Sequence, residues 1–303
     1  MYRYKRLLIS LNLTDLDITT LSYAGMVSRL SLSEKAYFLF VCRELEIPQK
    51  LLKEYPNFLE PLDEYAGNEM KEEIQHSFDG HPDIEEKIEV LQGNPLQQLL
   101  QYAVKKQIDL IVVGRKKDAS ETRRLPLKLA RKASCSVMVL PHQSKTAISK
   151  ILVPIDFSKN SADAMDVGIA FAAAAGITEI ICLHVYSLPL GFYKTGKSEE
   201  EFAEIMRRNA EGDYTDFIKQ INLKGLSVVP RFVLAKKTVK AICDTVNREG
   251  INLIAIGSRG RSNAAAVLLG SITEKLIMRT NIPIIAVKKK GANMKFLEAL
   301  LKI

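Results

Sequence analysis

The residues best suited to chemistry form the glycine-rich stretch GSRGRSNAAAVLLGS at residues 257–271 of this 303-residue chain. Gly257 is followed by Gly260 three residues later, and Gly270 directly precedes Ser271. Glycine permits positive φ angles and close backbone approach, and the amides at the start of a helix attract anions. The stretch fits an anion cradle and also a capped loop, so the elements around it must decide between the two.

Ten apolar runs bounded by polar turns indicate buried strands. Nearly continuous Ile, Leu and Val runs of this kind are typical of parallel sheets that are covered on both faces. Helical patterns separate the runs, so the sequence predicts an α/β fold. The runs are residues 6–13, 36–42, 88–93, 109–114 and 136–141, followed by 150–157, 179–185, 226–234, 252–257 and 283–288.

The two halves of the chain repeat each other at an offset of roughly 145 residues, which indicates tandem domains. The corresponding pairs are Leu7 and Ile151, Gly114 and Gly257, and Val137 and Ile284. We expect two doubly wound domains, residues 1–145 and 146–303, each with a five-stranded parallel sheet and helices on both faces. The last strands of the two domains are candidates for pairing within the chain, and a homodimer is a further option.

Helix signals lie between the predicted strands. Ser158 is the expected N-cap of a helix that runs to residue 176, and Gly250 is the expected end of a helix that begins at residue 238. The polar insertions after the second strand of each half predict amphipathic helices that cover a sheet face. These insertions are residues 48–75 and 198–222.

The glycine-rich stretch begins where a predicted strand ends. Gly257 closes the run 252–257, and ligands of open parallel sheets sit at the carboxyl ends of strands, near the point where the strand order reverses. We therefore expect backbone amides near Gly260 and Gly270 to face phosphate oxygens, with both glycines at positive φ or in close contact. On spacing alone, the anion site and the capped loop remain equally open, because a lone glycine pattern is a weak signal.

The helix expected at residues 271–280 would add the positive end of its dipole to this site, and Ser271 would add a hydroxyl. Arg259 and Arg261 are expected to screen charge at the rim, although exposed arginines beside a turn are ordinary. The site differs from a P-loop, because neither GKS nor GKT follows the glycines.

Composition narrows the class of protein. The chain is 47% hydrophobic and 26% charged, and no apolar run approaches the roughly 20 residues of a membrane span. The first apolar run is too short for a secretory signal, so we expect a soluble cytoplasmic protein. The net charge is +8, but aromatic residues are not interleaved with the basic clusters, which argues against nucleic-acid binding.

The cysteines and histidines do not form a metal-binding pattern. Cys42, Cys135, Cys182 and Cys243 are far apart and are expected to be buried and reduced, so we predict no zinc site and no catalytic thiol. His184 lies within ICLHVY, where strand packing is the expected role.

With its elements placed, the chain resembles the universal stress protein family. The family's pattern of glycine, two residues, glycine, nine residues, then glycine with serine or threonine is met by Gly257, Gly260, Gly270 and Ser271. The resemblance includes KILVPIDFSKNSADAM, EIICLHVY and GSITEKLIMRTNIPIIAVKK, and it extends over both halves as a tandem pair.

This resemblance implies the strand order 3-2-1-4-5 in each domain. It also implies ATP binding, usually with a divalent cation such as Mg²⁺ that is held by the phosphates and not by protein ligands. In the second domain, the implied adenine-binding residues lie at the ends of the first two strands, Gly257 lies near the ribose, and the rest surround the phosphates or their rim. The implied site residues are Pro154, Ile155, Asp156, Val185, Gly257, Arg259, Gly260, Gly270, Ser271 and Ile272.

Both halves depart from the family pattern. After its third strand the second half has Ala235 and Lys236, where the family often has glycine and proline, and Lys236 or Lys237 is placed to approach phosphates. The first half has Asn12 in place of Asp156, has no Gly-Ser pair and carries an amide-free Pro126, and Lys117 stands in place of Gly260. We predict that the first half does not bind ATP in the same way.

Three functions remain open at this point. The first is an ATP-binding universal stress protein with a regulatory role, in which the first half is structural or binds a protein partner. The second is an ATP-hydrolysing or adenylyl-transfer enzyme, for which Glu274 is the acid nearest the phosphates and better suits a surface pair. The third is a nucleotide-free scaffold. The tail, residues 291–303, is expected to dock as a short helix on its own domain, or alternatively on another subunit.

Overall fold

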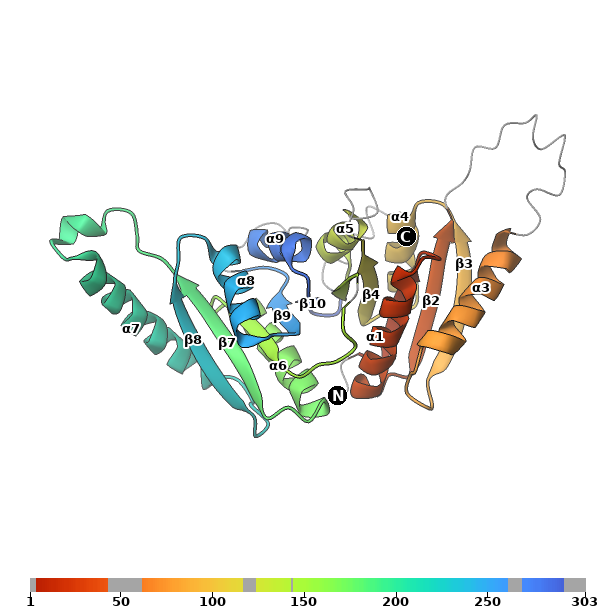
Figure 1. Ribbon diagram of the computed structural model, residues 1–303, viewed down its shortest axis with the longest axis horizontal. Helices are drawn as coiled ribbons and strands as arrows, with labels where there is room; N and C mark the ends of the chain where they lie inside the picture. Colours follow the sequence, from red (N-terminus) through yellow and green to blue (C-terminus); the bar gives the residue numbers. More distant parts are fainter. Residues whose placement is uncertain (1–3, 43–61, 117–123, 143, 261–268, 292–303) are drawn as a thin grey trace, which may run out of the picture.

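A computed structural model of the chain describes residues 4–42, 62–116, 124–142, 144–260 and 269–291 (Figure 1). Each of the ten predicted strands is present, and most of their bounds lie within a few residues of those expected. The strands are β1 (Arg6–Leu11), β2 (Lys35–Cys42), β3 (Glu85–Gln92), β4 (Leu110–Arg115), β5 (Ser136–Pro141), β6 (Ile151–Ile155), β7 (Glu179–Tyr186), β8 (Ser227–Leu234), β9 (Leu253–Gly257) and β10 (Ile284–Val287).

The strands form one sheet in the order β3-β2-β1-β4-β5-β10-β9-β6-β7-β8. Within each half the order is 3-2-1-4-5 and the pairing is parallel, as predicted. The predicted pairing of the last strands is also confirmed, because β5 and β10 are antiparallel neighbours with Met138 opposite Ile285. The two predicted five-stranded sheets are therefore joined into a single ten-stranded sheet.

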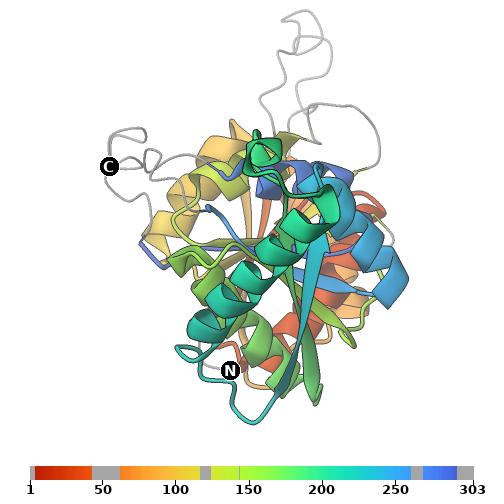
Figure 2. The same cartoon turned by 90° about the vertical axis from the view of Figure 1, so that its left-hand side faces the viewer.

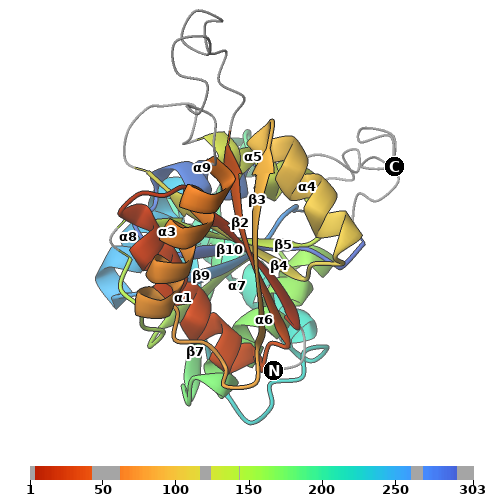
Figure 3. The same cartoon turned by 90° about the vertical axis from the view of Figure 1, so that its right-hand side faces the viewer.

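Helices cover both faces of this sheet. On one face, α1 (Leu16–Ser31), α3 (Leu62–Ser77), α6 (Lys159–Ala174) and α7 (Glu199–Ile218) pack against the strands. On the other face lie α4 (Pro95–Lys105), α5 (Arg124–Lys132), α8 (Thr238–Glu249) and α9 (Ser271–Arg279). Figure 3 shows β3 at the near edge of the sheet between α3 and α4, and Figure 2 shows α7 lying across the opposite end.

The predicted helix ends are confirmed where the structure describes them. Ser158 accepts a hydrogen bond from the Ser161 amide at 3.3 Å and caps α6, and Gly250 ends α8 in the left-handed region at φ 67°. Of the two polar insertions, one forms α7, which begins with a capping box at Ser198, and the other contributes α3. Part of the first insertion and the tail from residue 292 lie outside the described residues.

A left-handed residue follows the first strand of each half. Leu13 has φ 52° after β1, and Phe157, at the corresponding position after β6, has φ 63°. Residues other than glycine rarely adopt this backbone conformation, so the surrounding contacts must hold both residues in it. The recurrence shows that the repeat preserves the turn that leads from the first strand into the first helix.

The core consists of two apolar layers, one on each face of the sheet, and each layer runs through both halves. Leu7 and Val153 belong to one layer, and Leu8 and Leu152 belong to the other. In the first layer, the rings of Tyr4 and Phe171, which come from different halves, lie 6.1 Å apart. Because burial of apolar area is the main stabilising term, we expect the halves to support each other's stability.

Each half also places a buried cation at the end of a helix of the other half. The Arg115 guanidinium, at the end of β4, donates to the carbonyls of Ile277 and Thr280 at the C-terminus of α9. In the opposite direction, the Lys288 ammonium donates to the carbonyls of Arg131 and Ala133 at the C-terminus of α5, at 3.0 and 2.9 Å. Cations near helix C-termini are favourable, and here they join the two halves.

The buried ammonium predicts a pH dependence of stability. Burial lowers the pKa of Lys288 from its ordinary value of 10.5 to about 7, so between these values the unfolded chain binds more protons than the folded one. The free energy of unfolding should therefore rise with pH from about 7 to about 10, by up to roughly 1 kcal/mol per unit. Urea denaturation at pH 7, 8 and 9 measures the slope. A Lys288→Met variant should lose most of it, and an unchanged slope would refute the assignment.

No helix in the described part of the chain is long and apolar enough to cross a membrane. The four cysteines are free, and Cys42, Cys135 and Cys182 are buried as predicted. Cys243 is only half-buried, which corrects the expectation for that residue. Burial raises the pKa of the Cys135 thiol to about 12, so this side chain is a packing group and not a nucleophile.

Candidate functional site

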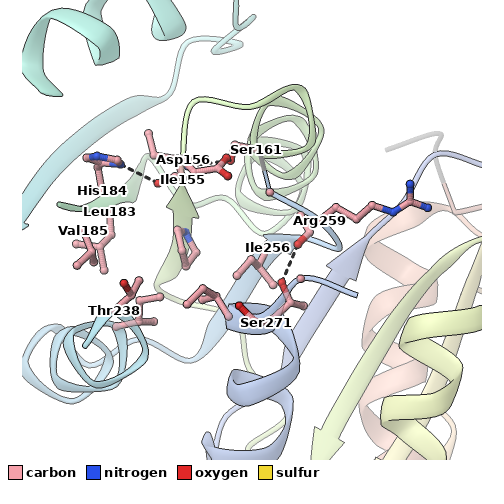
Figure 4. A pocket seen from close by; sticks show the side chains of 17 residues that line it. Ile155, Asp156, Ser161, Leu183, His184, Val185, Thr238, Ile256, Arg259 and Ser271 are labelled. Atoms are coloured by element: carbon pink, nitrogen blue, oxygen red, sulfur yellow. Dashed lines mark hydrogen bonds between the residues drawn. The ribbon is translucent and has the colours of Figure 1, made fainter. Parts of the chain in front are cut away.

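A pocket lies at the carboxyl ends of β6, β7 and β9, beside the starts of α8 and α9 (Figure 4). The strand order of the second half reverses between β6 and β9, because β7 and β8 extend from one side of β6 while β9 and β10 extend from the other. Crossovers at such a point leave the helices on opposite faces, and a crevice opens between them. The pocket is where the sequence placed the ligand site.

All ten residues named from the sequence line this pocket: Pro154, Ile155, Asp156, Val185, Gly257, Arg259, Gly260, Gly270, Ser271 and Ile272. The cavity has a volume of about 300 Å³, at the lower end of the range for small-molecule sites. The sequence did not indicate a further set of lining residues. These are Ser161, Leu183, His184, Thr238, Ile242, Ile256 and Thr273.

One side of the pocket is apolar. Ile155 is the last residue of β6, and Leu183 is the last buried residue of β7. Ile242 of α8 and Ile256 of β9 also line this side. All four side chains are less than 7% exposed to solvent, so they form a fixed wall. Val185 completes this side (Figure 4). A flat aromatic group such as a nucleobase is the kind of ligand part that such a wall suits.

Asp156 is held at the mouth of β6 by the start of α6. Its carboxylate accepts hydrogen bonds from the Ser161 hydroxyl at 2.7 Å and from the Ser158 amide at 3.1 Å. In return, the Ser161 hydroxyl accepts from the Asp156 amide at 3.0 Å. Figure 4 shows the two side chains facing each other. Several bonds fix the carboxylate, so its position is set before any ligand arrives.

His184 lines the pocket, whereas the sequence suggested only strand packing. Its Nδ1 lies 3.0 Å from the Ile155 carbonyl oxygen, and its ring stacks on Phe157 with centroids 4.4 Å apart. The Phe157 ring also packs against the Phe217 ring of α7, with the ring centroids 5.8 Å apart. The packing role is therefore real, and the register of β7 opposite β6 adds a position at the pocket that a single strand pattern does not reveal.

Close contact explains two of the glycines. A Cβ on Gly260 would lie 2.6 Å from Oδ2 of Asp156, and a Cβ on Gly257 would lie 2.8 Å from the Asn160 carbonyl oxygen of α6. The Gly257 contact is with backbone, so that position requires glycine, whereas a side chain at Gly260 would force the Asp156 carboxylate to move. The alternative expectation of positive φ is wrong for Gly260 and Gly270, since neither is among the glycines at positive φ, and Gly270 has φ −61° and ψ 137°.

The opposite end of the pocket is the start of α9. Gly270 is the N-cap residue, its amide donates to the Ser258 carbonyl at 2.8 Å, and no side chain caps the helix. The Thr273 hydroxyl, in the first turn, donates to the Gly257 carbonyl at 2.9 Å and ties the helix start to β9. First-turn amides and the helix dipole together favour an anion at this end.

The basic residues that the sequence placed at the rim of the phosphate site do not gather around the pocket in the described part of the chain. Arg259 lines the pocket, but Figure 4 shows its side chain pointing away from the other labelled residues. Arg261 lies outside the described residues. Lys236 and Lys237 line an adjacent cavity. Neither is among the described residues that line the pocket. Glu274 forms an ion pair with Arg131 of the first half at 2.8 Å, as the sequence suggested for a surface pair.

At the corresponding edge of the first half, a leucine side chain packs against a glycine near the end of the fourth strand of that half. A Cβ on Gly114 would lie 2.6 Å from Cδ2 of Leu16, so this leucine packs where the second half has backbone. The Asn12 amide donates to the Asp17 carboxylate at 2.7 Å, and Asp17 is fully buried, which raises its pKa. Lys117 lies outside the described residues. These contacts favour the prediction that the first half does not bind ATP in the same way.

Within the described residues, no group of three or more His, Cys, Asp or Glu side chains is arranged to hold a metal ion.

The fold and the pocket define an α/β protein with a pocket at the strand switch point of its second half. The model of the universal stress protein family matches residues 31–141 and 147–288, and the chain belongs to this family as a tandem member. Residues 142–146 lie between the two matches.

Known relatives agree with this assignment. A universal stress protein of Methanocaldococcus jannaschii is 32% identical over 161 residues, which cover 47% of this chain and 96% of that protein. Among solved structures, a universal stress protein from Archaeoglobus fulgidus is similar over 95% of this chain and 99% of its own, with a TM-score of 0.64 and 17% identity. A Pseudomonas aeruginosa protein of unknown function covers 99% and 97%, with a TM-score of 0.62 and 14% identity. The two structural likenesses show that the tandem fold is shared.

Proposed function

We propose that this protein binds ATP in its second unit, residues 146–303, and that nucleotide occupancy serves a regulatory role. The observation that carries the proposal is the convergence of all ten sequence-predicted residues on one pocket at the switch point. The apolar wall would take the adenine, and Asp156 would face it. Gly260, Gly270, Ser271 and the amide of Ile272 would surround the phosphates.

The residues present fit a nucleotide phosphate group. The uncapped start of α9 offers its first-turn amides to an anion, and Gly270 at the N-cap adds no side chain there. Mg²⁺ would be held by the phosphates and would neutralise part of their charge. The protein's own part is to bind the base, to admit the phosphates and to orient both.

Binding without dedicated catalysis is the better interpretation of these contacts. Asp156 is the only carboxylate among the described lining residues, and it is already engaged by Ser161 and Ser158. Glu274 pairs with Arg131 across the junction. A hydrolase or adenylyl transferase needs a positioned base or a carboxylate that binds the metal near the phosphates, and neither acid is arranged for this task.

The regulatory part of the proposal rests on α9. Its first turn lines the pocket, and its last turn is held by Arg115 of the first half. Its middle carries Glu274, paired with Arg131. A ligand that changes the position of the helix start would act on both junction contacts, because a short helix moves largely as a unit. The first half, or a protein partner bound to it, would sense the nucleotide through this helix.

Thermal melting with and without ATP and Mg²⁺ tests the proposal. At a ligand concentration 100 times the dissociation constant, we expect roughly 2.7 kcal/mol of added stability. Gly270→Val should abolish the shift, because it adds a branched side chain at the phosphate end of the pocket. Gly270→Ala is the matched control, since its Cβ would make only ordinary contacts at 3.5 Å with Arg259 and Ser258. No shift in the native protein, or one that Gly270→Val leaves unchanged, would refute ATP binding here.

A further inference from the structure

A second cavity adjoins the nucleotide pocket. It has a volume of about 440 Å³ and lies between the start of α8 and the outer side of α9. Thr238 and Ile272 line both cavities, so only these two residues need to be passed between a group bound in one cavity and a group bound in the other. The remaining lining residues are Lys236, Lys237, Val239, Lys240, Lys275 and Arg279.

The cavity is strongly cationic. Five of its eight lining residues are lysine or arginine, contributed by the loop after β8, the first turn of α8 and two successive turns of α9, and no carboxylate is among the eight. Lys240 forms an ion pair with Asp244 at 3.3 Å. In the described part of the chain, no carboxylate oxygen lies within 4.0 Å of the charged nitrogens of the other four. Clustered like charges cost stability unless an anion offsets them.

The backbone adds to this positive field. Lys237 is the N-cap residue of α8, and no side chain accepts a hydrogen bond from the amides of the first turn of that helix. Thr238, Val239 and Lys240 form this turn and also line the cavity. Amides at a helix start and several ammonium groups around one hollow are the chemistry that recognises a phosphate group.

We propose that this cavity, which we call the lysine cavity, binds a second phosphate group carried on the ribose of the nucleotide. This inference rests on the proposed function, because it takes the orientation of the nucleotide from it. With the base against Val185 and the 5′ phosphates at Gly260 and Gly270, the part of the ligand nearest Thr238 is the ribose. A phosphate on the 2′ or 3′ oxygen would then reach the lysine cavity past Thr238, which lines both cavities.

The proposal narrows the ligand class. An unsubstituted ribose hydroxyl would leave the lysine cavity without an anion, whereas a ribose phosphate would bring about two negative charges to Lys236 and Lys237. The preferred ligand of this protein is thus an adenine nucleotide that carries phosphate on its 5′ oxygen and also on its 2′ or 3′ oxygen. ATP is bound by the same pocket but leaves the lysine cavity open.

Isothermal titration calorimetry at 0.15 M salt, where the Debye length is about 8 Å and distant charges are screened, tests this class. The probes are AMP, adenosine 2′,5′-bisphosphate, adenosine 3′,5′-bisphosphate and ATP with Mg²⁺. One of the two bisphosphates should bind at least about tenfold more tightly than AMP. Lys236→Gln combined with Lys237→Gln should remove that advantage and leave the ATP affinity within about twofold. Lys194→Gln with Lys197→Gln removes two exposed lysines outside both cavities and should change nothing.

The outcomes separate the two proposals. If ATP binds but neither bisphosphate exceeds AMP, the lysine cavity is not a ribose-phosphate site, and the proposed function stands. If the lysine substitutions weaken ATP as much as the bisphosphate, the lysines serve the 5′ phosphate chain, and this inference is overturned. If no adenine nucleotide binds, the proposed function fails and the inference fails with it.

Discussion

Gly260→Val should lower the affinity for ATP by about 100-fold or more, equivalent to at least roughly 2.7 kcal/mol. The first added carbon would lie 2.6 Å from the Asp156 carboxylate, so one of the two must move. Asp156 is bonded to Ser161 and Ser158, so its displacement would disturb the end of β6 that faces the base. The valine would also occupy space at the phosphate end. Isothermal titration calorimetry with ATP and Mg²⁺ measures the loss.

Gly212→Ala is the matched control for this substitution. Gly212 lies within α7 of the same half, and a Cβ there would meet nothing within 4 Å. Alanine in a helix interior is favoured over glycine, so the control should bind ATP normally and gain about 0.5–1 kcal/mol of stability. If Gly260→Val bound ATP as tightly as the control, the glycine would not border the ligand, and the placement of the phosphates would be wrong.

Arg115→Leu should reduce the free energy of unfolding by about 3 kcal/mol. Arg115 is 7% exposed, and its guanidinium donates to the Ile277 and Thr280 carbonyls at the end of α9. Leucine cannot donate, so the C-terminal carbonyls of that helix would lose a charged partner at a buried site, and breaking such a contact is far more costly than removing a surface pair. Urea denaturation followed by circular dichroism measures the change.

Arg208→Leu provides the comparison, because Arg208 is a largely exposed arginine whose pair with Glu204 lies on the surface of α7. We expect a change of no more than about 0.5 kcal/mol there. If Arg115→Leu lowered the free energy of unfolding as little as Arg208→Leu, the view that the buried cations join the halves would be contradicted. The account of how α9 communicates with the first half would then lose its basis.

The strands and the residues that line the pocket were predictable because they depend on local patterns. Buried runs such as residues 109–114 and 252–257 identify strands by composition alone, and the spacing of Gly257, Gly260 and Gly270 matches a family pattern. The resemblance to that family then implies the strand order 3-2-1-4-5 in each half, which the structure shows. For these reasons the fold and the ten lining residues followed from the sequence.

Other features depend on side-chain direction and on contacts between distant segments. His184 lines the pocket only because β7 lies beside β6, and Arg259 lines the pocket with its side chain directed elsewhere. The contacts of Arg115 and Lys288 with helix ends of the opposite half depend on the β5–β10 pairing, and no periodicity encodes their targets. The sequence suggested that Lys236 and Lys237 approach phosphates, but only the packing of α8 beside α9 shows that they line a separate cavity.

The number of ATP molecules bound per chain tests the central claim most directly. The second half has the pocket with its glycine end, and in the first half Leu16 packs against Gly114, the counterpart of Gly257. Calorimetric titration of the native protein with ATP and Mg²⁺ should therefore give one site per chain, and Gly260→Val should leave none of comparable affinity. A stoichiometry of two, or one site that survives Gly260→Val unchanged, would contradict the assignment of nucleotide binding to the second half.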